Sequence, residues 1–427
     1  MIVRRAIQCL TCGHKTVTRT AVGYGDYQEL AFPCVECGIE IRYGMKLLLE
    51  KRLARSFAMG KKKGKAWIQQ EMKRVSKLPS IQYVNWVNAK PCEETPEIVD
   101  VVTLDPARLI PIKEGEQFSP FLATIFLPKD IEQFAMHQRM RTTVAKIHGP
   151  RVLKLATHFD RKQWVLFDNQ LKEIGVGVSG KNELERISAL YYCAELTGRV
   201  FGVGNEKCYQ QVSQRLIFAE SKSPALVKQL ADFFRAKKKD ESIMKELWSI
   251  RQRWYSLYES LSPIYCSFYW DEKKHSLDDF KLPEKRFEQL KQLYVDCFET
   301  FCRVSVIAAG IEGIIKQQVL GVPAKRLWTL AEFDVCKNGS KPDILKQLTV
   351  GDLFVPFIDS HLRNGVGHHA AHYSADSDSI EYVNENPKGI TRENISYTRF
   401  CEKVVTLYGQ LEAVSNYPQW IRRYTFR

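Results

Sequence analysis

The sequence predicts a mainly α-helical protein that begins with a small β-rich module. Residues 282–318 carry apolar side chains at alternating steps of three and four, which is typical of one long amphipathic helix. Similar spacing recurs in much of the chain after residue 130, whereas the first 46 residues alternate apolar and polar side chains as strands do. We therefore expect four regions, at residues 1–46, 47–80, 81–270 and 271–427.

The chain is basic, with 63 lysines and arginines against 49 aspartates and glutamates and a formal net charge of +14. This balance favours a polyanion, most simply nucleic acid, as substrate or partner, although charge alone does not distinguish such a protein from one with an indifferent basic surface. No run of about 18 or more apolar residues is present, so no membrane span is expected. The first residues lack the apolar core of a signal peptide, and most of the 12 cysteines are scattered. We expect a protein of the reducing cytoplasm.

Four cysteines near the N-terminus form two C-x-x-C pairs, Cys9 with Cys12 and Cys34 with Cys37. Their spacing is typical of one tetrahedral Zn²⁺ that takes two thiolates from each of two turns. A glycine follows each pair directly, where a tight turn around sulfur requires it. The expected zinc ion is structural, because four cysteines leave no open coordination position for chemistry. His14 is expected to be a bystander.

Between and after these pairs, residues 16–20, 27–32 and 39–43 alternate as strands do, so residues 1–46 are predicted to form a zinc ribbon. Residues 47–80 are densely basic, and residues 45–59 are spaced as a helix. This region is either a contact for nucleic-acid phosphates or a solvated linker, and the sequence leaves both readings open.

Residues 81–270 give the weakest signal, and we expect a mostly helical region of unknown fold. Four prolines make residues 91–111 irregular. Helical spacing follows at residues 130–147, 182–197, 226–236 and 243–261. Four aromatic residues crowd the last of these helices, and their helical spacing favours a buried core over base stacking. They are Trp248, Trp254, Tyr255 and Tyr258.

The last region is expected to be an α-helical bundle. Besides the helix of residues 282–318, helices are predicted over residues 325–333, 341–348, 353–362 and 391–414. Thr391 is expected to cap the last helix, and a short strand is expected over residues 380–383.

Arg363, Asn364 and His368 are the candidate catalytic residues. An arginine holds phosphate by charge and by its planar fork, and a histidine transfers a proton near neutral pH. These two types suffice for RNA cleavage without a metal, because a base activates the 2′-OH while a cation stabilises the developing charge. Five positions are about one and a half helical turns, so one helix does not aim both side chains at one spot, and two antiparallel copies in a homodimer would do so. Gly365 and Gly367 predict a helix that frays at the motif.

This stretch resembles the motif of the HEPN superfamily, in which an arginine, usually followed by a polar residue, precedes a histidine with four to six residues between them. The resemblance covers about the last third of the chain. It implies a metal-independent endoribonuclease that binds RNA at a site shared by two chains and leaves a cyclic phosphate. It also implies a phage-defence or toxin effector, for which a regulatory protein or antitoxin would be a further partner. Some HEPN relatives lack nuclease activity, so the alternative is a non-catalytic zinc-ribbon adaptor that binds nucleic acid or protein and dimerises through the helical bundle.

Overall fold

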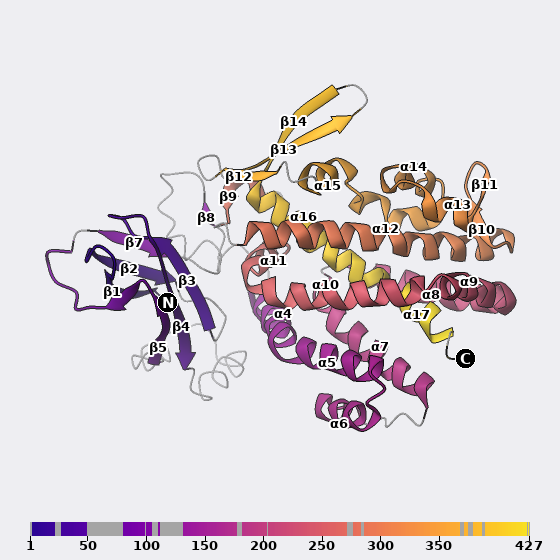
Figure 1. Ribbon diagram of the computed structural model, residues 1–427, viewed down its shortest axis with the longest axis horizontal. Coiled ribbons are helices and arrows are strands. Elements are labelled where there is room, and N and C mark those ends of the chain that lie inside the picture. Colours follow the sequence, from indigo (N-terminus) through magenta and orange to yellow (C-terminus); the bar gives the residue numbers. More distant parts are fainter. Residues whose placement is uncertain are drawn as a thin grey trace. The chain divides into compact units, whose positions relative to one another are not determined.

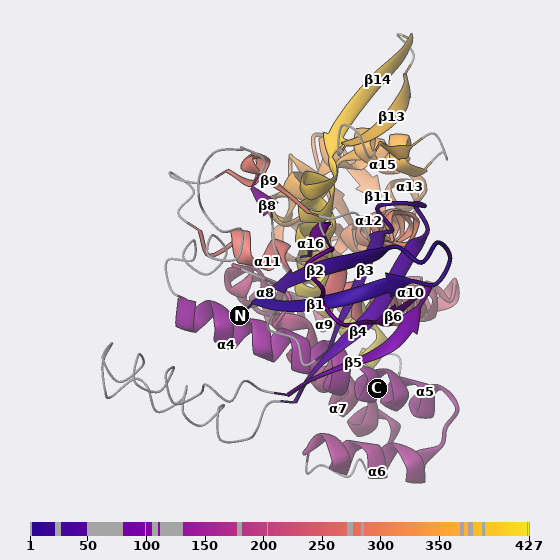
Figure 2. The same cartoon turned by 90° about the vertical axis from the view of Figure 1, so that its left-hand side faces the viewer.

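Four strands near the N-terminus pair as two antiparallel hairpins, β1 (Ile2–Cys9) with β2 (Lys15–Ala21) and β3 (Tyr27–Pro33) with β4 (Glu40–Leu48). The strands that follow are β5 (Ser80–Val87), β6 (Ala89–Pro91), β7 (Val101–Leu104) and β8 (Ile110–Pro111). Three of them extend the hairpins into two sheets, ordered β6-β1-β2-β7 and β3-β4-β5 (Figures 1 and 2).

The chain divides into two units, residues 1–131 and 132–427, and each is described by itself. The computed structural model describes residues 2–21, 27–48, 80–98, 100–104, 110–111, 131–176, 182–202, 204–270, 276–282, 286–367, 371–374, 379–386, 389–424 and 426. Within these ranges the protein is mainly α-helical, with a small β-rich N-terminal unit, as the sequence predicts.

The two sheets of the N-terminal unit share one apolar core. Ile7 of β1 and Met45 of β4 are fully buried in it, and burial of such side chains contributes about 1.5–3 kcal/mol each. Tyr43 lies on the same face of β4 as Met45, because alternate residues of a strand face the same side. Its hydroxyl is 3.0 Å from that of Thr18, and its ring stacks on Trp86 with centroids 4.7 Å apart. The contact with Thr18 of β2 connects the two sheets, whereas Trp86 belongs to β5, in the same sheet as Tyr43.

Strands β5, β6 and β7 correct the expectation of helical or irregular chain over residues 80–104. Each depends on a distant partner; for example, β7 pairs in parallel with β2 and sets Val101 opposite Val17. Such pairing leaves no local periodicity for sequence analysis to detect. The helix expected over residues 45–59 is wrong at its start, since β4 continues to Leu48. Most of the predicted basic region, residues 47–80, lies outside the described residues, and the predicted domain boundaries stay predictions.

One long helix, α12 (Phe287–Gln317), lies at the centre of the second unit and confirms the long amphipathic helix. Its residues 304–314 are buried on every side. The helices packed against it include α8 (Glu206–Lys222), α9 (Pro224–Ala236), α10 (Lys239–Leu261), α16 (Tyr397–Val414) and α17 (Asn416–Tyr424) (Figure 1). Of the four aromatic residues of α10 predicted to be core, Trp254 and Tyr258 are buried, whereas Trp248 and Tyr255 are half-buried. The Trp254 ring stacks on Tyr408 at 3.8 Å between centroids.

A second group of helices packs against α10 and α16. It begins with α4 (Ile131–Thr143), which passes through a π-helical turn, Val144–His148, into α5 (Gly149–Asp160). A Cβ at Gly149 would lie 2.5 Å from the Tyr255 ring, so a glycine allows this close approach to α10. The group continues with α6 (Trp164–Ile174) and α7 (Glu183–Arg199). The helices expected over residues 182–197, 226–236 and 243–261 are thus confirmed, whereas α5, α6, α8 and α17 are additional.

Short elements connect α10 to α12 and α12 to α16. They are α11 (Ile264–Ser267), η3 (Leu277–Asp279), β9 (Phe280–Lys281), β10 (Gly321–Pro323), β11 (Leu327–Thr329), α13 (Leu330–Val335), η4 (Asn338–Ser340), α14 (Lys341–Leu345), η5 (Thr349–Leu353), η6 (Val355–Phe357), α15 (Ser360–Gly367), β12 (His372–Ser374), β13 (Ser379–Asn386) and β14 (Gly389–Ser396). None of the helices in the described part of the chain combines the length and apolar character that a membrane-spanning segment requires.

Three predicted helices of the last region need correction. The helix expected over residues 325–333 begins only at Leu330, because residues 327–329 form β11, which pairs with β10. Residues 389–396 form β14, which pairs with β13, and α16 starts only at Tyr397. Ser396, rather than Thr391, caps it by accepting a hydrogen bond from the Arg399 backbone N–H. The helix expected over residues 353–362 is instead two short 3₁₀ turns followed by α15. Pro356 lies in the second turn and has no N–H for a continuous helix.

Candidate functional site

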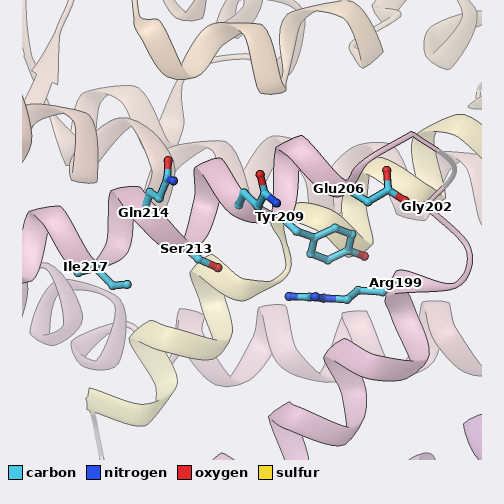
Figure 3. Close-up of a pocket in the computed structure, with 8 residues that line it drawn as sticks. Arg199, Gly202, Glu206, Tyr209, Ser213, Gln214 and Ile217 are labelled. Atoms are coloured by element: carbon cyan, nitrogen blue, oxygen red, sulfur yellow. The ribbon is translucent and has the colours of Figure 1, made fainter.

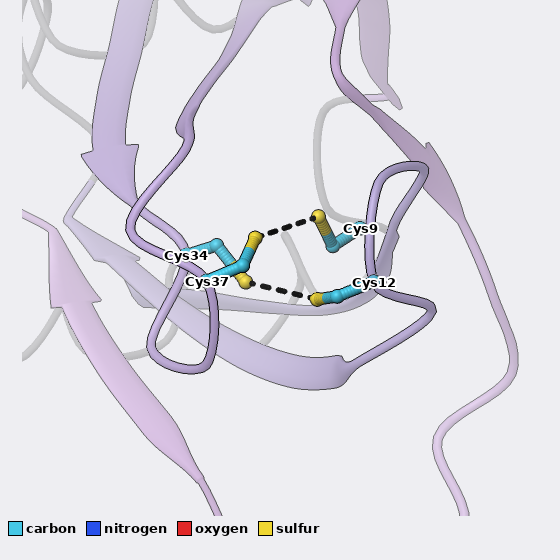
Figure 4. A group of neighbouring side chains, drawn as sticks. All are labelled: Cys9, Cys12, Cys34 and Cys37. Carbon is cyan, nitrogen blue, oxygen red and sulfur yellow. Dashed lines mark hydrogen bonds between the residues drawn. The ribbon is translucent and has the colours of Figure 1, made fainter.

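The four cysteines predicted to bind metal come together in the N-terminal unit (Figure 4). The Sγ atoms of Cys9 and Cys37 are 3.8 Å apart, those of Cys12 and Cys34 are 3.7 Å apart, and all four lie within 4.8 Å of one another. Zn–S bonds of about 2.3 Å in a tetrahedron place sulfurs about 3.8 Å apart. The donor set and spacing therefore fit a closed four-thiolate metal site, and they are compatible with zinc.

The two turns that carry the cysteines have the same backbone design. In the first turn, the Cys9 N–H donates to the His14 carbonyl at 2.8 Å, and the Gly13 N–H donates back to the Cys9 carbonyl at 3.0 Å. The second turn has the same two hydrogen bonds: the Cys34 N–H donates to the Ile39 carbonyl, and the Gly38 N–H donates to the Cys34 carbonyl. The first turn requires glycine because Gly13 has a φ of +77°, a conformation that other residues rarely adopt. Each hairpin thus presents two thiols from a fixed loop.

The thiols differ in acidity because they lie so close together. Burial raises the pKa of Cys9, but backbone hydrogen bonds from Cys12 and Thr11 outweigh it and bring that pKa to about 6. A backbone hydrogen bond at His14 lowers the pKa of Cys12, yet burial and the neighbouring thiols raise it to about 12. A divalent cation would stabilise all four thiolate charges at once. His14 is not part of this cluster, since its Nε2 pairs with Asp100 Oδ2 at 2.9 Å.

Arg363 and Asn364 lie in the middle of α15, in the second unit. Leu362 and Val366 bury the other face of this helix, while the Arg363 side chain is 26% exposed. The helix extends through Gly367, the residue before His368. His368, the third candidate catalytic residue, follows that glycine in the sequence and lies outside the described residues.

Gly365 has a packing role that accounts for a glycine inside the motif. A Cβ at this position would lie 2.1 Å from the ring of Tyr382 in β13. Gly367 is less constrained, since its Cβ would come no closer than 3.7 Å to Val295. Glycine lowers the helix propensity at position 365, but it allows α15 to pack closely against Tyr382 of β13.

The guanidinium of Arg363 contacts Asn364, which the sequence motif includes, and Glu299, which it does not. Its Nη2 forms an ion pair with Glu299 of α12, and its Nη1 donates to Asn364 Oδ1 at 3.2 Å. Its Nε is buried and has no hydrogen-bond partner among the described residues. The other Glu299 oxygen accepts a hydrogen bond from Asn338 Nδ2 at 2.5 Å. Glu299 and Asn338 come from distant parts of the chain, so only the fold reveals them.

Two other histidines near the motif are exposed. His361 is exposed on α15, and His372 is exposed on β12, where its Nε2 lies 3.5 Å from Glu381. His369 lies outside the described residues.

A separate surface pocket of about 430 Å³ borders α8 (Figure 3). Arg199 lies 5.1 Å from the centroid of the Tyr209 ring, and it also pairs with Glu195. The lining carries one guanidinium and one carboxylate, that of Glu206, so no net charge marks a preferred ligand. Neither Arg363 nor Asn364 lines it.

No protein-family model matches the chain, and searches of curated proteins and of solved structures find no significant match.

Proposed function

We propose that the protein is a metal-independent endoribonuclease of the HEPN type, with Arg363, Asn364 and His368 as its catalytic residues. The observation that carries this proposal is the position of Arg363: a partly exposed guanidinium on a short, well-packed helix that ends just before His368 in the sequence. A guanidinium in such a place can reach a phosphate in solution, and the packed face of α15 limits its movement.

Each catalytic residue has a distinct role in this proposal. Arg363 binds the scissile phosphate and stabilises the charge that develops on it. His368 takes the proton from the 2′-OH and returns one to the leaving 5′-oxygen, so the products carry a cyclic phosphate and a 5′-hydroxyl. Asn364 either orients the histidine or holds a phosphate oxygen. The active form is a homodimer in which both chains contribute an arginine and a histidine to one cleft.

In this proposal the N-terminal unit is a zinc ribbon with a structural Zn²⁺. The four-cysteine cluster supports it, because sulfur ligands in a tetrahedron suit zinc and leave no position for a substrate. The ribbon would position RNA or a protein partner, in keeping with the net charge of +14. A phage-defence or toxin role is the biological setting that the HEPN resemblance implies.

An RNA-cleavage assay in EDTA tests the nuclease directly. The wild type should cleave RNA and leave cyclic phosphate ends, while Arg363→Ala and His368→Ala should each lower the rate by about 10²-fold or more. His361→Ala is the matched control, because His361 is exposed on the same helix and has no proposed role. Equal cleavage by the wild type and His368→Ala would contradict the proposal. Zinc content measured on the same samples shows whether EDTA has removed a structural ion.

The ion pair of Arg363 with Glu299 supports one alternative, a non-catalytic zinc-ribbon adaptor that dimerises through its helical unit. Its arginine would then be a structural residue. Induction of the protein in cells separates the two functions: growth arrest by the wild type, with normal growth on His368→Ala, excludes a pure adaptor. Identical growth effects of both proteins would favour the adaptor.

A further inference from the structure

Glu299 occupies the anion-binding face of Arg363. One carboxylate oxygen pairs with Arg363 Nη2, and the other accepts the hydrogen bond from Asn338 at 2.5 Å. The carboxylate therefore bridges α15 and the η4 turn from its place on α12. It is 28% exposed, so this bridge lies at the surface rather than in the core.

A carboxylate and a phosphate bind a guanidinium in the same way. Both present two oxygens to its planar fork, and both are held by charge-assisted hydrogen bonds. Arg363 Nη1 already donates to Asn364, and Nε is buried. The fork thus has one face for an oxyanion, and Glu299 holds part of it.

We propose that Glu299 is an internal stand-in for the substrate phosphate, which RNA must displace from Arg363 before cleavage. The hydrogen bond from Asn338 stabilises Glu299 in this position. This inference rests on the proposed function, since it takes Arg363 as the phosphate-binding residue. Glu299 is then a residue that regulates binding, and loss of its charge strengthens the binding of RNA.

The test measures binding of a short single-stranded RNA with 2′-O-methyl groups, which cannot be cleaved, to full-length protein. Glu299→Gln should bind several-fold more tightly than the wild type, and Asn338→Ala should give a smaller gain. Glu288→Gln is the matched control: it makes the same change on the same helix, but its side chain is 73% exposed and pairs only with Lys291 among the described residues. It should change affinity by less than twofold.

A second comparison shows that the gain passes through Arg363. In an Arg363→Ala background, Glu299→Gln should increase the affinity for RNA by no more than the Glu288→Gln control does, because the ion pair that competes with RNA no longer exists. Thermal unfolding of each variant verifies that the fold is intact.

The outcomes separate this inference from the nuclease proposal. A Glu299→Gln variant that binds no better than Glu288→Gln, or more weakly, overturns the displacement of Glu299, even if the wild type cleaves RNA. A gain in binding that depends on Arg363, with no cleavage of unmodified RNA by any variant, supports displacement and counts against the nuclease.

Discussion

Gly365 lies where α15 comes closest to β13, and it gives the sharpest packing constraint near the motif. Because an added methyl group would lie 2.1 Å from the Tyr382 ring, Gly365→Ala should lower the free energy of unfolding by about 1–3 kcal/mol. Gly367→Ala in the same helix has room and should cause no such loss. Urea unfolding of both variants makes the comparison. Equal stability would mean that the Tyr382 ring can move aside.

Arg251 and Glu412 form a buried ion pair between α10 and α16, with side chains only 1% and 2% exposed. Glu412 accepts two hydrogen bonds from the guanidinium, at 2.7 and 2.8 Å. Burial lowers the pKa of Arg251, but the Glu412 charge and hydrogen bonds outweigh this effect and raise it above its ordinary value.

Glu412→Gln should therefore destabilise the protein by about 3–5 kcal/mol, since it leaves a buried cation without its counter-charge. The exposed pair of Arg235 and Asp232 gives the control: Asp232→Asn should change stability by less than about 1 kcal/mol. Chemical denaturation measures both. Equal losses of stability in the two variants would show that the buried ion pair contributes no more to stability than the exposed one.

At the scale of elements, Glu312 of α12 contacts two neighbouring elements, α8 and η5. Its carboxylate pairs with Arg215 of α8 and with Lys316, and it accepts the Thr349 N–H of η5 at 3.2 Å. Burial raises the pKa of Glu312, but these partners outweigh it, so the folded pKa lies below the ordinary 4.5. A carboxyl with a lowered pKa stabilises the fold above its unfolded pKa, and it loses this contribution as the pH falls through the folded value.

The stability difference between the wild type and Glu312→Gln should thus be largest near neutral pH and shrink below pH 4.5. Denaturation at a series of pH values from neutral to acidic measures the difference. A constant difference across that range would mean that the Glu312 charge does not stabilise the fold.

The metal centre is another property of local elements. Cys34→Ser should lower the zinc content from about one ion per chain to nearly none and destabilise the N-terminal unit. Cys92→Ser is the control, because Cys92 is outside the cluster. Elemental analysis of freshly purified protein measures the metal. Full zinc content in Cys34→Ser would contradict the four-cysteine assignment.

The sequence predicts the four-cysteine cluster well because each C-x-x-C pair lies within one turn, where spacing and the following glycine already define the geometry. It also predicts α12, whose apolar spacing continues over 31 residues. It fails at β7 and β14, whose strands depend on partners, and it gives no sign of Glu299. The contact between Glu299 and Arg363 exists only because α15 packs on α12, and local periodicity contains no such information.

At the scale of the whole molecule, the proposed mechanism needs two chains. Arg363 and His368 are five positions apart, so one chain does not direct both side chains at the same phosphate if the helix continues. A shared cleft would contain two arginines and two histidines. An equal mixture of Arg363→Ala and His368→Ala would then form mixed dimers that still hold one of each.

Mixing these two inactive variants should therefore restore part of the RNA-cleaving activity, up to about the fraction of mixed dimers. Light scattering establishes the mass of the particle in the same buffer, where a dimer is expected. A monomer that cleaves RNA would exclude the shared site.

A dimer whose mixed form stays inactive would mean either that both arginines and both histidines are required at once or that a working pair comes from a single chain. Wild-type chains mixed with a double variant, Arg363→Ala with His368→Ala, decide between these arrangements, because that mixture contains wild-type dimers and mixed dimers with one complete chain. Activity above that of the wild-type dimers alone assigns both residues of a working pair to the same chain, whereas activity equal to theirs means that all four residues are required.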